Sequence, residues 1–279
     1  FADVWSSLSS ASWAHIGFGA VLAQGVYATE ALGMRFATGA ALPLVPLAAL
    51  QLSVRWITLA VPSVAGRVGM NAAFLTHFEV PATIAVVQGA VDGLAGFLVE
   101  VTLLLTALLL VDLPSTPDVP IRWEVVALAV VGVSVVSALV VWRVRRLREI
   151  VVPVVRDAYS MVAEFVRDPR RAAGLLGANL GTRLILGAAL WFILVALDAP
   201  LSIAGAVVVT VATNLLAGLV PVPGGIGVAE AALTSFLVLA GIDPESAFSA
   251  AVVFRLVTFY LPSIGGWFAT RWLRRNEYL

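Results

Sequence analysis

The chain has 279 residues, of which 61% are hydrophobic and 12% are charged, and its mean hydropathy is +1.00. Apolar stretches of about 18 residues or more recur along nearly the whole length, which is typical of membrane-spanning helices. The absence of cysteine excludes disulfides, thiol catalysis and cysteine-ligated metal sites, and two histidines are too few for a histidine-based metal site.

Hydropathy predicts five uninterrupted spans and two interrupted hairpins, which together make an all-α polytopic membrane helix bundle. The spans are expected near 13–34, 81–111, 123–142, 172–197 and 247–270. The hairpins are expected near 40–78 and 202–240. Residues 150–168 place valines on one face and charges elsewhere, which predicts an amphipathic connector at the cytoplasmic interface.

Each hairpin is broken by a segment rich in proline and glycine, 62–69 in the first and 221–228 in the second. Proline removes a backbone donor and glycine relaxes the backbone, so neither segment continues a regular helix. Paired breaks in two halves of a chain are a sequence indication of a transporter-type binding site. Laying Pro62 on Pro221, and Pro81 on Pro244, pairs Arg55 with Asn214, Asn71 with Glu230, and Asp92 with Arg255.

The distribution of charge predicts the orientation of the chain in the membrane. Arginines are concentrated near 143–148, 167–171 and 271–275, whereas the loops near 112–122, 198–201 and 241–246 carry mostly acidic residues. By the positive-inside rule the arginine-rich segments, including the C-terminal one, face the cytoplasm of a bacterial-type inner membrane. The first hairpin then enters from the cytoplasmic side and the second from the outer side, which is an inverted-topology repeat.

We therefore expect one membrane domain over 1–279, with repeat one near 13–142, the connector at 150–168 and repeat two near 172–275. The hairpin limbs are long enough to leave full crossing open. Non-helical backbone at membrane depth is tolerated only where protein buries it or where it lines a wet cavity. The breaks therefore favour re-entrant hairpins whose tips meet near the midplane.

Charged residues inside the predicted spans are the main candidates for function. An arginine at the centre of a membrane helix costs roughly 2.5–3.5 kcal/mol on insertion scales, so Arg55 and Arg255 are candidates for substrate binding. An alternative that stays equally open is that each arginine pairs with a carboxylate such as Asp92, Glu100 or Glu230 and locks the bundle. Asp92 is a candidate counter-ion for Arg255 across the pseudo-symmetry axis.

Three further polar residues are candidates on weaker grounds. Glu230 follows Gly225 by five residues, where an acidic side chain either stabilises a helix start or serves as a proton or amine partner. Asn214 is of a type that commonly forms hydrogen bonds between membrane helices. Asn71 is a candidate because it corresponds to Glu230 in the other repeat.

Glycines at the two breaks add a candidate anion site. Gly66, and Gly224 with Gly225 and Gly227, each open a half-helix whose free N–H groups could receive an anion, with Arg67 close by in the sequence. One glycine-rich stretch is a weak signal for phosphate, but two in inverted repeats are a stronger one. The sequence contains no nucleophile elbow, zincin motif or Walker loop, so we predict no enzyme activity, no cofactor and no metal.

The segment 214–230, together with Gly241-Ile-Asp-Pro-Glu and the run 254–262, resembles the lysylphosphatidylglycerol synthase transmembrane-region family. The segment 62–71 resembles the first-repeat motif of that family. The family contains the flippase half of the multiple peptide resistance factors, and the resemblance implies translocation of anionic or aminoacylated lipids or lipid-linked precursors. Its motif maps onto Pro223, Gly224, Gly225, Gly227, Glu230 and Arg255.

The leading hypothesis is a flippase or lipid-transport domain whose partner is a membrane lipid with an anionic head group. Family members that make aminoacyl-lipids carry a separate soluble transferase domain, to which nothing here corresponds, so synthase activity is not expected. The sequence leaves open a transferase or other domain in a longer chain, and a homo-oligomer; it predicts no nucleic-acid partner. The first alternative is a membrane scaffold or lipid-binding subunit for a partner enzyme; a small-solute transporter and a membrane-embedded enzyme are further ones.

Overall fold

The computed structural model describes residues 11–61, 63–110, 167–199, 201–218 and 222–279, which form helices and contain no strand. The helices are α2 (Trp13–Thr38), α3 (Leu44–Ile57), α4 (Ser63–His77), α5 (Ala82–Leu110), α8 (Pro169–Ala196), α9 (Ile203–Gly218), the 3₁₀ turn η1 (Pro223–Gly225), α10 (Val228–Leu239), α11 (Pro244–Arg255), the π-helical turn η2 (Leu256–Tyr260) and α12 (Leu261–Arg275). The predicted span 123–142, nearly all of the connector 150–168, and both Pro62 and Pro221 lie outside the described residues.

Three segments among the described residues are long and apolar enough to cross a membrane: Val87–Ala107 within α5, Pro169–Ala196, and Pro244–Arg275. They correspond to three of the predicted spans. The 26-residue α2 is of similar length but contains Gln24, Glu30 and Arg35. The described part of the chain is therefore a multi-pass membrane helix bundle.

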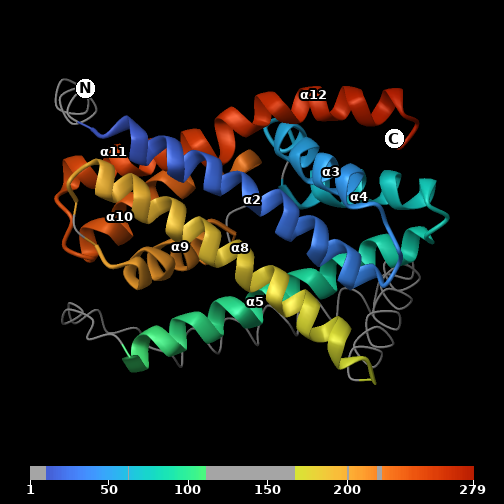
Figure 1. Ribbon diagram of the computed structural model, residues 1–279, viewed down its shortest axis with the longest axis horizontal. Coiled ribbons are helices and arrows are strands. Elements are labelled where there is room, and N and C mark those ends of the chain that lie inside the picture. The colour runs from blue at the N-terminus through green and yellow to red at the C-terminus, as the bar shows by residue number, and fades with distance from the viewer. Residues whose placement is uncertain (1–10, 62, 111–166, 200, 219–221) are drawn as a thin grey trace, which may run out of the picture.

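The centre of the bundle is the long crossing of α2 and α8, which run in opposite directions (Figure 1). Small residues bring the two backbones together: a Cβ on Gly19 would lie only 3.1 Å from the Ala189 carbonyl oxygen. At the middle of the crossing the hydroxyls of Thr29 and Thr182 are 2.7 Å apart and share a hydrogen bond. Close approach through small residues with polar contacts between helices is the usual way in which membrane helices pack.

The two predicted hairpins form as helix pairs at opposite ends of this crossing. The pair α3–α4 lies toward the end where α2 finishes, and the pair α9–α10 lies toward the end where α8 finishes (Figure 1). These four helices have 14, 15, 16 and 12 residues. At about 1.5 Å per residue they are about 18–24 Å long, which is shorter than the roughly 30 Å hydrocarbon core.

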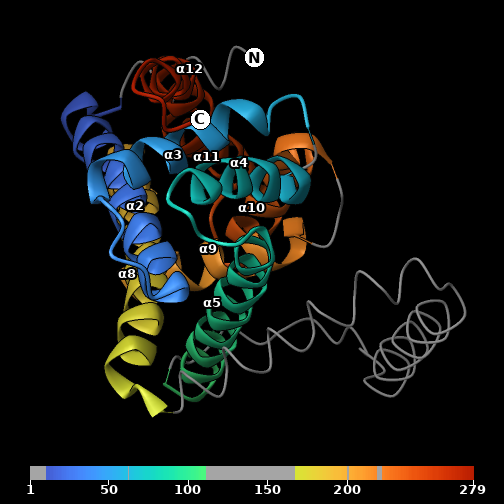
Figure 2. The same ribbon diagram turned by 90° about the vertical axis from the view of Figure 1, so that its right-hand side faces the viewer.

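The continuous helix made by α11, η2 and α12 connects the two ends of the molecule (Figure 1). The helix α12 packs along α3, as both views show (Figures 1 and 2). Gly266 allows this contact, because a Cβ there would collide with the Leu52 carbonyl oxygen and approach Trp56. One buried cluster lies around α8, α10 and α11, and a second lies where α2, α3 and α4 meet the end of α12. The helix α4 of the first hairpin also contacts η1 of the second.

Candidate functional site

In the second half of the chain, the carboxylate of Glu230 accepts hydrogen bonds from three groups at the break. Arg255 Nε donates to Glu230 Oε1 at 2.9 Å, and the Tyr260 hydroxyl donates to the same oxygen at 2.8 Å. The Gly227 N–H donates to Glu230 Oε2 at 2.7 Å, which caps the first turn of α10. The side chains of Arg255 and Glu230 are only 13% and 16% exposed. The arrangement is a compact anion-holding site with its anion supplied by the chain.

The backbone at this break is left-handed at three positions. Gly224, Gly225 and Gly227 have φ values of +62°, +63° and +84°, a region that other residues adopt at a cost. A Cβ on Gly224 would also lie 2.5 Å from the Phe259 ring. Because Gly224 has no side chain, its carbonyl turns toward Arg255 and accepts a hydrogen bond from Nη2 at 2.7 Å.

In the first half, the hub is Glu30 of α2, which the sequence analysis did not single out. Its Oε1 accepts from Arg55 Nη2 at 2.9 Å and from Arg67 Nη2 at 3.5 Å, so one carboxylate joins both limbs of the hairpin to α2. Arg67 also lies 4.0 Å from Asp92 of α5. Asp92 accepts from the Asn179 amide of α8 at 3.0 Å. Four helices are therefore connected by charge at this level.

A third set of polar contacts lies between α5, α8 and α9. Arg183 of α8 pairs with Glu100 of α5 at 2.9 Å, and the Asn214 amide of α9 donates to the same carboxylate oxygen at 2.5 Å. The side chain of Glu100 is 5% exposed and that of Arg183 is 17% exposed. Charges this deeply buried are tolerated because they are paired.

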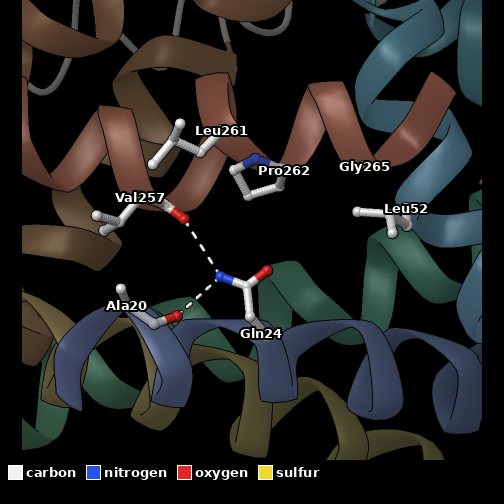
Figure 3. A pocket seen from close by; sticks show the side chains of 7 residues that line it. All are labelled: Ala20, Gln24, Leu52, Val257, Leu261, Pro262 and Gly265. Atoms are coloured by element: carbon white, nitrogen blue, oxygen red, sulfur yellow. Dashed lines mark hydrogen bonds between the residues drawn. The ribbon is translucent and has the colours of Figure 1, made fainter. Parts of the chain in front are cut away.

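The helix that carries Arg255 changes its hydrogen-bond pattern directly after that residue. In η2 the Leu261 N–H donates to the Leu256 carbonyl, one residue farther back than in an α-helix. The Val257 carbonyl then receives nothing from Leu261, and Pro262 has no N–H to give. The side-chain amide of Gln24 on α2 donates to this carbonyl at 3.3 Å, and to a carbonyl one turn earlier in its own helix at 2.8 Å (Figure 3).

A cavity of about 280 Å³ lies beside this turn, between α2, α3 and α12 (Figure 3). Gln24 is the one polar side chain in its wall, and none of the charged residues described above lines it. The wall is made by Ala20, Gln24, Leu52, Val257, Leu261, Pro262 and Gly265. The cavity is therefore separate from the candidate site.

The structure brings most of the predicted site residues to the two breaks and their neighbours. Pro223 begins η1, the Gly224 carbonyl and the Gly227 N–H contact Arg255 and Glu230, and Gly225 lies in the turn between them. Asn71 is 4% exposed on α4, and its Oδ1 has no hydrogen-bond partner among the described residues. Asn214 contacts Glu100 and forms no hydrogen bond with the described residues of either break. No group of three or more His, Cys, Asp or Glu side chains is arranged to hold a metal in the described ranges.

Two predictions differ from the structure. Asp92 is not the counter-ion of Arg255: it lies beside Arg67 and Asn179, whereas Arg255 pairs with Glu230. Gly66 does not open α4, which already begins at Ser63; it is a buried residue inside the helix. A Cβ on Gly66 would lie 3.2 Å from the Ile57 side chain, so this glycine allows the two limbs of the hairpin to pack closely.

A search of curated proteins finds no match to this chain. The family described as "Lysylphosphatidylglycerol synthase TM region" matches residues 1–266. The matched part covers both halves of the bundle, both hairpins and all three sets of ion pairs. The chain belongs to the lysylphosphatidylglycerol synthase transmembrane-region family.

Proposed function

We propose that this domain moves a phospholipid with an anionic or aminoacylated head group, or a lipid-linked precursor, between the leaflets of the membrane. The observation that carries the proposal is that α4, which contains most of the first break, contacts η1 of the second break, and that an arginine–carboxylate pair lies beside each. A head group that carries an anion could exchange partners with these pairs. The acyl chains would remain in the bilayer beside the bundle.

We further propose that the two halves are inverted repeats with re-entrant hairpins. The order of a long helix, a broken hairpin and a long helix occurs twice, and the hairpin helices are too short to span the hydrocarbon core. The sequence alignment pairs Arg55 with Asn214 and Ser263 with Glu100, and both Asn214–Glu100 and Arg55–Ser263 are in contact. The Asn214 amide donates to the Glu100 carboxylate, and the Ser263 hydroxyl donates to the backbone carbonyl of Arg55 at 3.2 Å.

An inverted repeat supplies the symmetry that alternating access needs, because each half can adopt the conformation of the other. The arginine-rich end of the chain would face the cytoplasm of an inner membrane. The chain carries no ATP-binding motif of its own, so we propose transport without ATP hydrolysis by this domain and without enzyme activity.

The test is leaflet exchange of a fluorescent anionic phospholipid in liposomes that contain the purified protein. We expect exchange above that of protein-free liposomes, and a loss of about tenfold or more in Arg255→Ala, because the arginine is the main positive charge at the second break. Arg271→Ala on the exposed end of α12 serves as the control and should leave exchange unchanged. Correctly folded protein that gives no exchange with any anionic or aminoacylated lipid would overturn the proposal.

A further inference from the structure

Each of three hydrogen-bond donors at the second break is taken by the same residue. The guanidinium of Arg255, the hydroxyl of Tyr260 and the N–H of Gly227 all donate to the two carboxylate oxygens of Glu230, at 2.7–2.9 Å. The donors come from α11, from η2 and from the start of α10. The donors that would attract an external anion are thus already occupied by the carboxylate of Glu230.

Two of the three donors are also held by groups other than this carboxylate. Arg255 is also held by the Gly224 carbonyl at 2.7 Å, and its guanidinium lies 4.3 Å from the centre of the Phe259 ring. The Gly227 N–H is fixed by the backbone at the start of α10. Glu230, in contrast, holds its carboxylate at the end of a flexible side chain. Departure of the carboxylate would therefore leave a preorganised site with a positive charge and the positive end of a helix dipole.

The shape of the site matches one class of ligand. The donors reach two oxygen atoms that share a single negative charge, with two donors on one oxygen and one on the other. A phosphodiester likewise has two free oxygens that share one negative charge. Phosphodiesters link the head group to the glycerol in phospholipids other than phosphatidic acid.

We propose that Glu230 is an internal competitor for the phosphodiester of the lipid, so that the structure shows a self-occupied resting state. Binding then exchanges one anion for another at the same donors, and the Glu230 side chain swings away. The buried arginine is never left unpaired, which avoids the large penalty of an isolated charge inside the membrane. This inference rests on the proposed function, because it describes the regulation of the same site.

The experiment measures binding of dihexanoyl phosphatidylglycerol to the purified protein in detergent by titration calorimetry. Glu230→Gln removes the competing charge and keeps a side chain of the same size. We expect it to bind this lipid about tenfold more tightly than the wild type, even though its exchange in liposomes is slower. Glu245→Gln removes one negative charge from an exposed position nearby in the sequence and should leave the affinity unchanged. Equal or weaker binding by folded Glu230→Gln overturns the proposal.

A second variant keeps the test decisive if Glu230→Gln does not fold. In Glu230→Ala the site is empty, so added acetate should raise the melting temperature of this variant and compete with the lipid. In the wild type, acetate should neither raise the melting temperature nor compete with the lipid. Inorganic phosphate is the third probe: binding of phosphate without binding of the short-chain lipid would show an ion site, and would refute a site for lipid.

These measurements separate the two proposals. Tight binding by Glu230→Gln together with no leaflet exchange by the wild type would refute the transport function and retain the competitor. Leaflet exchange that depends on Arg255, together with no gain in lipid affinity for Glu230→Gln, would support the transport function and refute the competitor.

Discussion

The two broken hairpins hold their arginines in different ways. In the first half, Arg55 and Arg67 reach out of the hairpin to Glu30 on the long helix α2, so the ion pairs connect separate elements. In the second half, Arg255 pairs with Glu230, which lies just after the break in the neighbouring helix α10. The first arrangement ties the hairpin to the central crossing, whereas the second keeps its charges close to a left-handed turn of backbone.

The difference indicates that the ion pairs of the two halves have different roles. Pairs that join distant elements should contribute mainly to the stability of the bundle, because losing either partner leaves a charge buried between helices. The pair at the second break joins two successive helices, α10 and α11, so its loss should disturb the rest of the bundle less. The following variants test this comparison.

The largest expected effect is at the pair that joins α5, α8 and α9. Glu100→Ala leaves Arg183 buried without its partner and removes the acceptor of Asn214, so the free energy of unfolding should fall by about 3–5 kcal/mol. Glu230→Ala should reduce it by less, because Arg255 keeps its contacts with Gly224 and Phe259. Unfolding by denaturant in detergent micelles gives both values.

The double variant Glu100→Ala with Arg183→Leu is the control for this prediction. Replacing both members of a buried ion pair by apolar residues restores much of the stability that the loss of one member removes. The contrast between pairs that join separate helices and the pair held at the second break would be wrong if Glu100→Ala were no more destabilising than Glu230→Ala.

The second effect concerns the backbone at the break. Gly224→Ala forces a left-handed residue to carry a Cβ and pushes it against Phe259, so we expect a loss of about 1–3 kcal/mol and weaker lipid exchange. The corresponding residue of the first half is already an alanine, Ala65, inside the helix α4.

Gly177→Ala in the middle of α8 is the matched control. Its Cβ would meet nothing within 4 Å, and its φ is not in the left-handed region. The replacement should be neutral or stabilise the helix by up to about 1 kcal/mol. A tolerated Gly224→Ala would show that the left-handed turn is not needed, and the two breaks would then be more alike than the structure indicates.

Much of the fold follows from the sequence. The predicted spans 13–34, 81–111 and 172–197 agree closely with Trp13–Thr38, Ala82–Leu110 and Pro169–Ala196, because long and mostly apolar runs are a strong signal for membrane helices. The glycine and proline signals also locate both hairpins. The prediction for Gly66 was wrong, because α4 begins three residues earlier and this glycine serves the packing of the two hairpin limbs instead.

The residues that belong to the site were easier to predict than the contacts between them. The sequence alignment pairs Asp92 with Arg255 as equivalent positions, but equivalent residues in two repeats lie at related places in separate halves and need not touch. Glu30 was overlooked although the rule applied to Arg55, that an ionisable group inside a span is a functional candidate, applies to it equally. Tyr260 and Gln24 carry no charge, so only the packing of helices shows which groups they contact.

A smaller loss of stability is expected at the π turn, where the two halves also differ. The long helix α5 of the first half is unbroken, whereas its counterpart changes pattern at Leu256–Tyr260. Gln24→Leu removes the side-chain donor to the Val257 carbonyl, so stability should fall by about 1 kcal/mol, measured by denaturant unfolding.

Pro262→Ala tests the cause of this effect, because alanine restores a backbone N–H within reach of the freed carbonyls of the turn. Gln24→Leu should therefore be less harmful in the Pro262→Ala background than in the wild type. Equal losses in both backgrounds would mean that Gln24 acts through packing alone.

The smallest effect is expected in the loops that follow the hairpins. In the second half, Asp243 caps α11 by accepting from the N–H groups of Ser246 and Glu245 at 3.0 and 3.1 Å. The first half has Val80 before Pro81 at the corresponding turn, so it has no side-chain cap there. Hydrogen bonds from the Ser246 backbone lower the pKa of the exposed Asp243 carboxyl below its ordinary value.

Because this pKa is lower in the folded state, Asp243 stabilises the protein fully above the unfolded pKa of about 3.9. The contribution disappears as the pH falls from there through the folded pKa. Asp243→Ala should lower the melting temperature slightly at pH 7, and the difference from the wild type should vanish in strong acid. Val80→Ala, at the matching turn, should show no such dependence on pH. A constant difference for Asp243→Ala between neutral and acid conditions would mean that the ionised carboxylate does not cap α11.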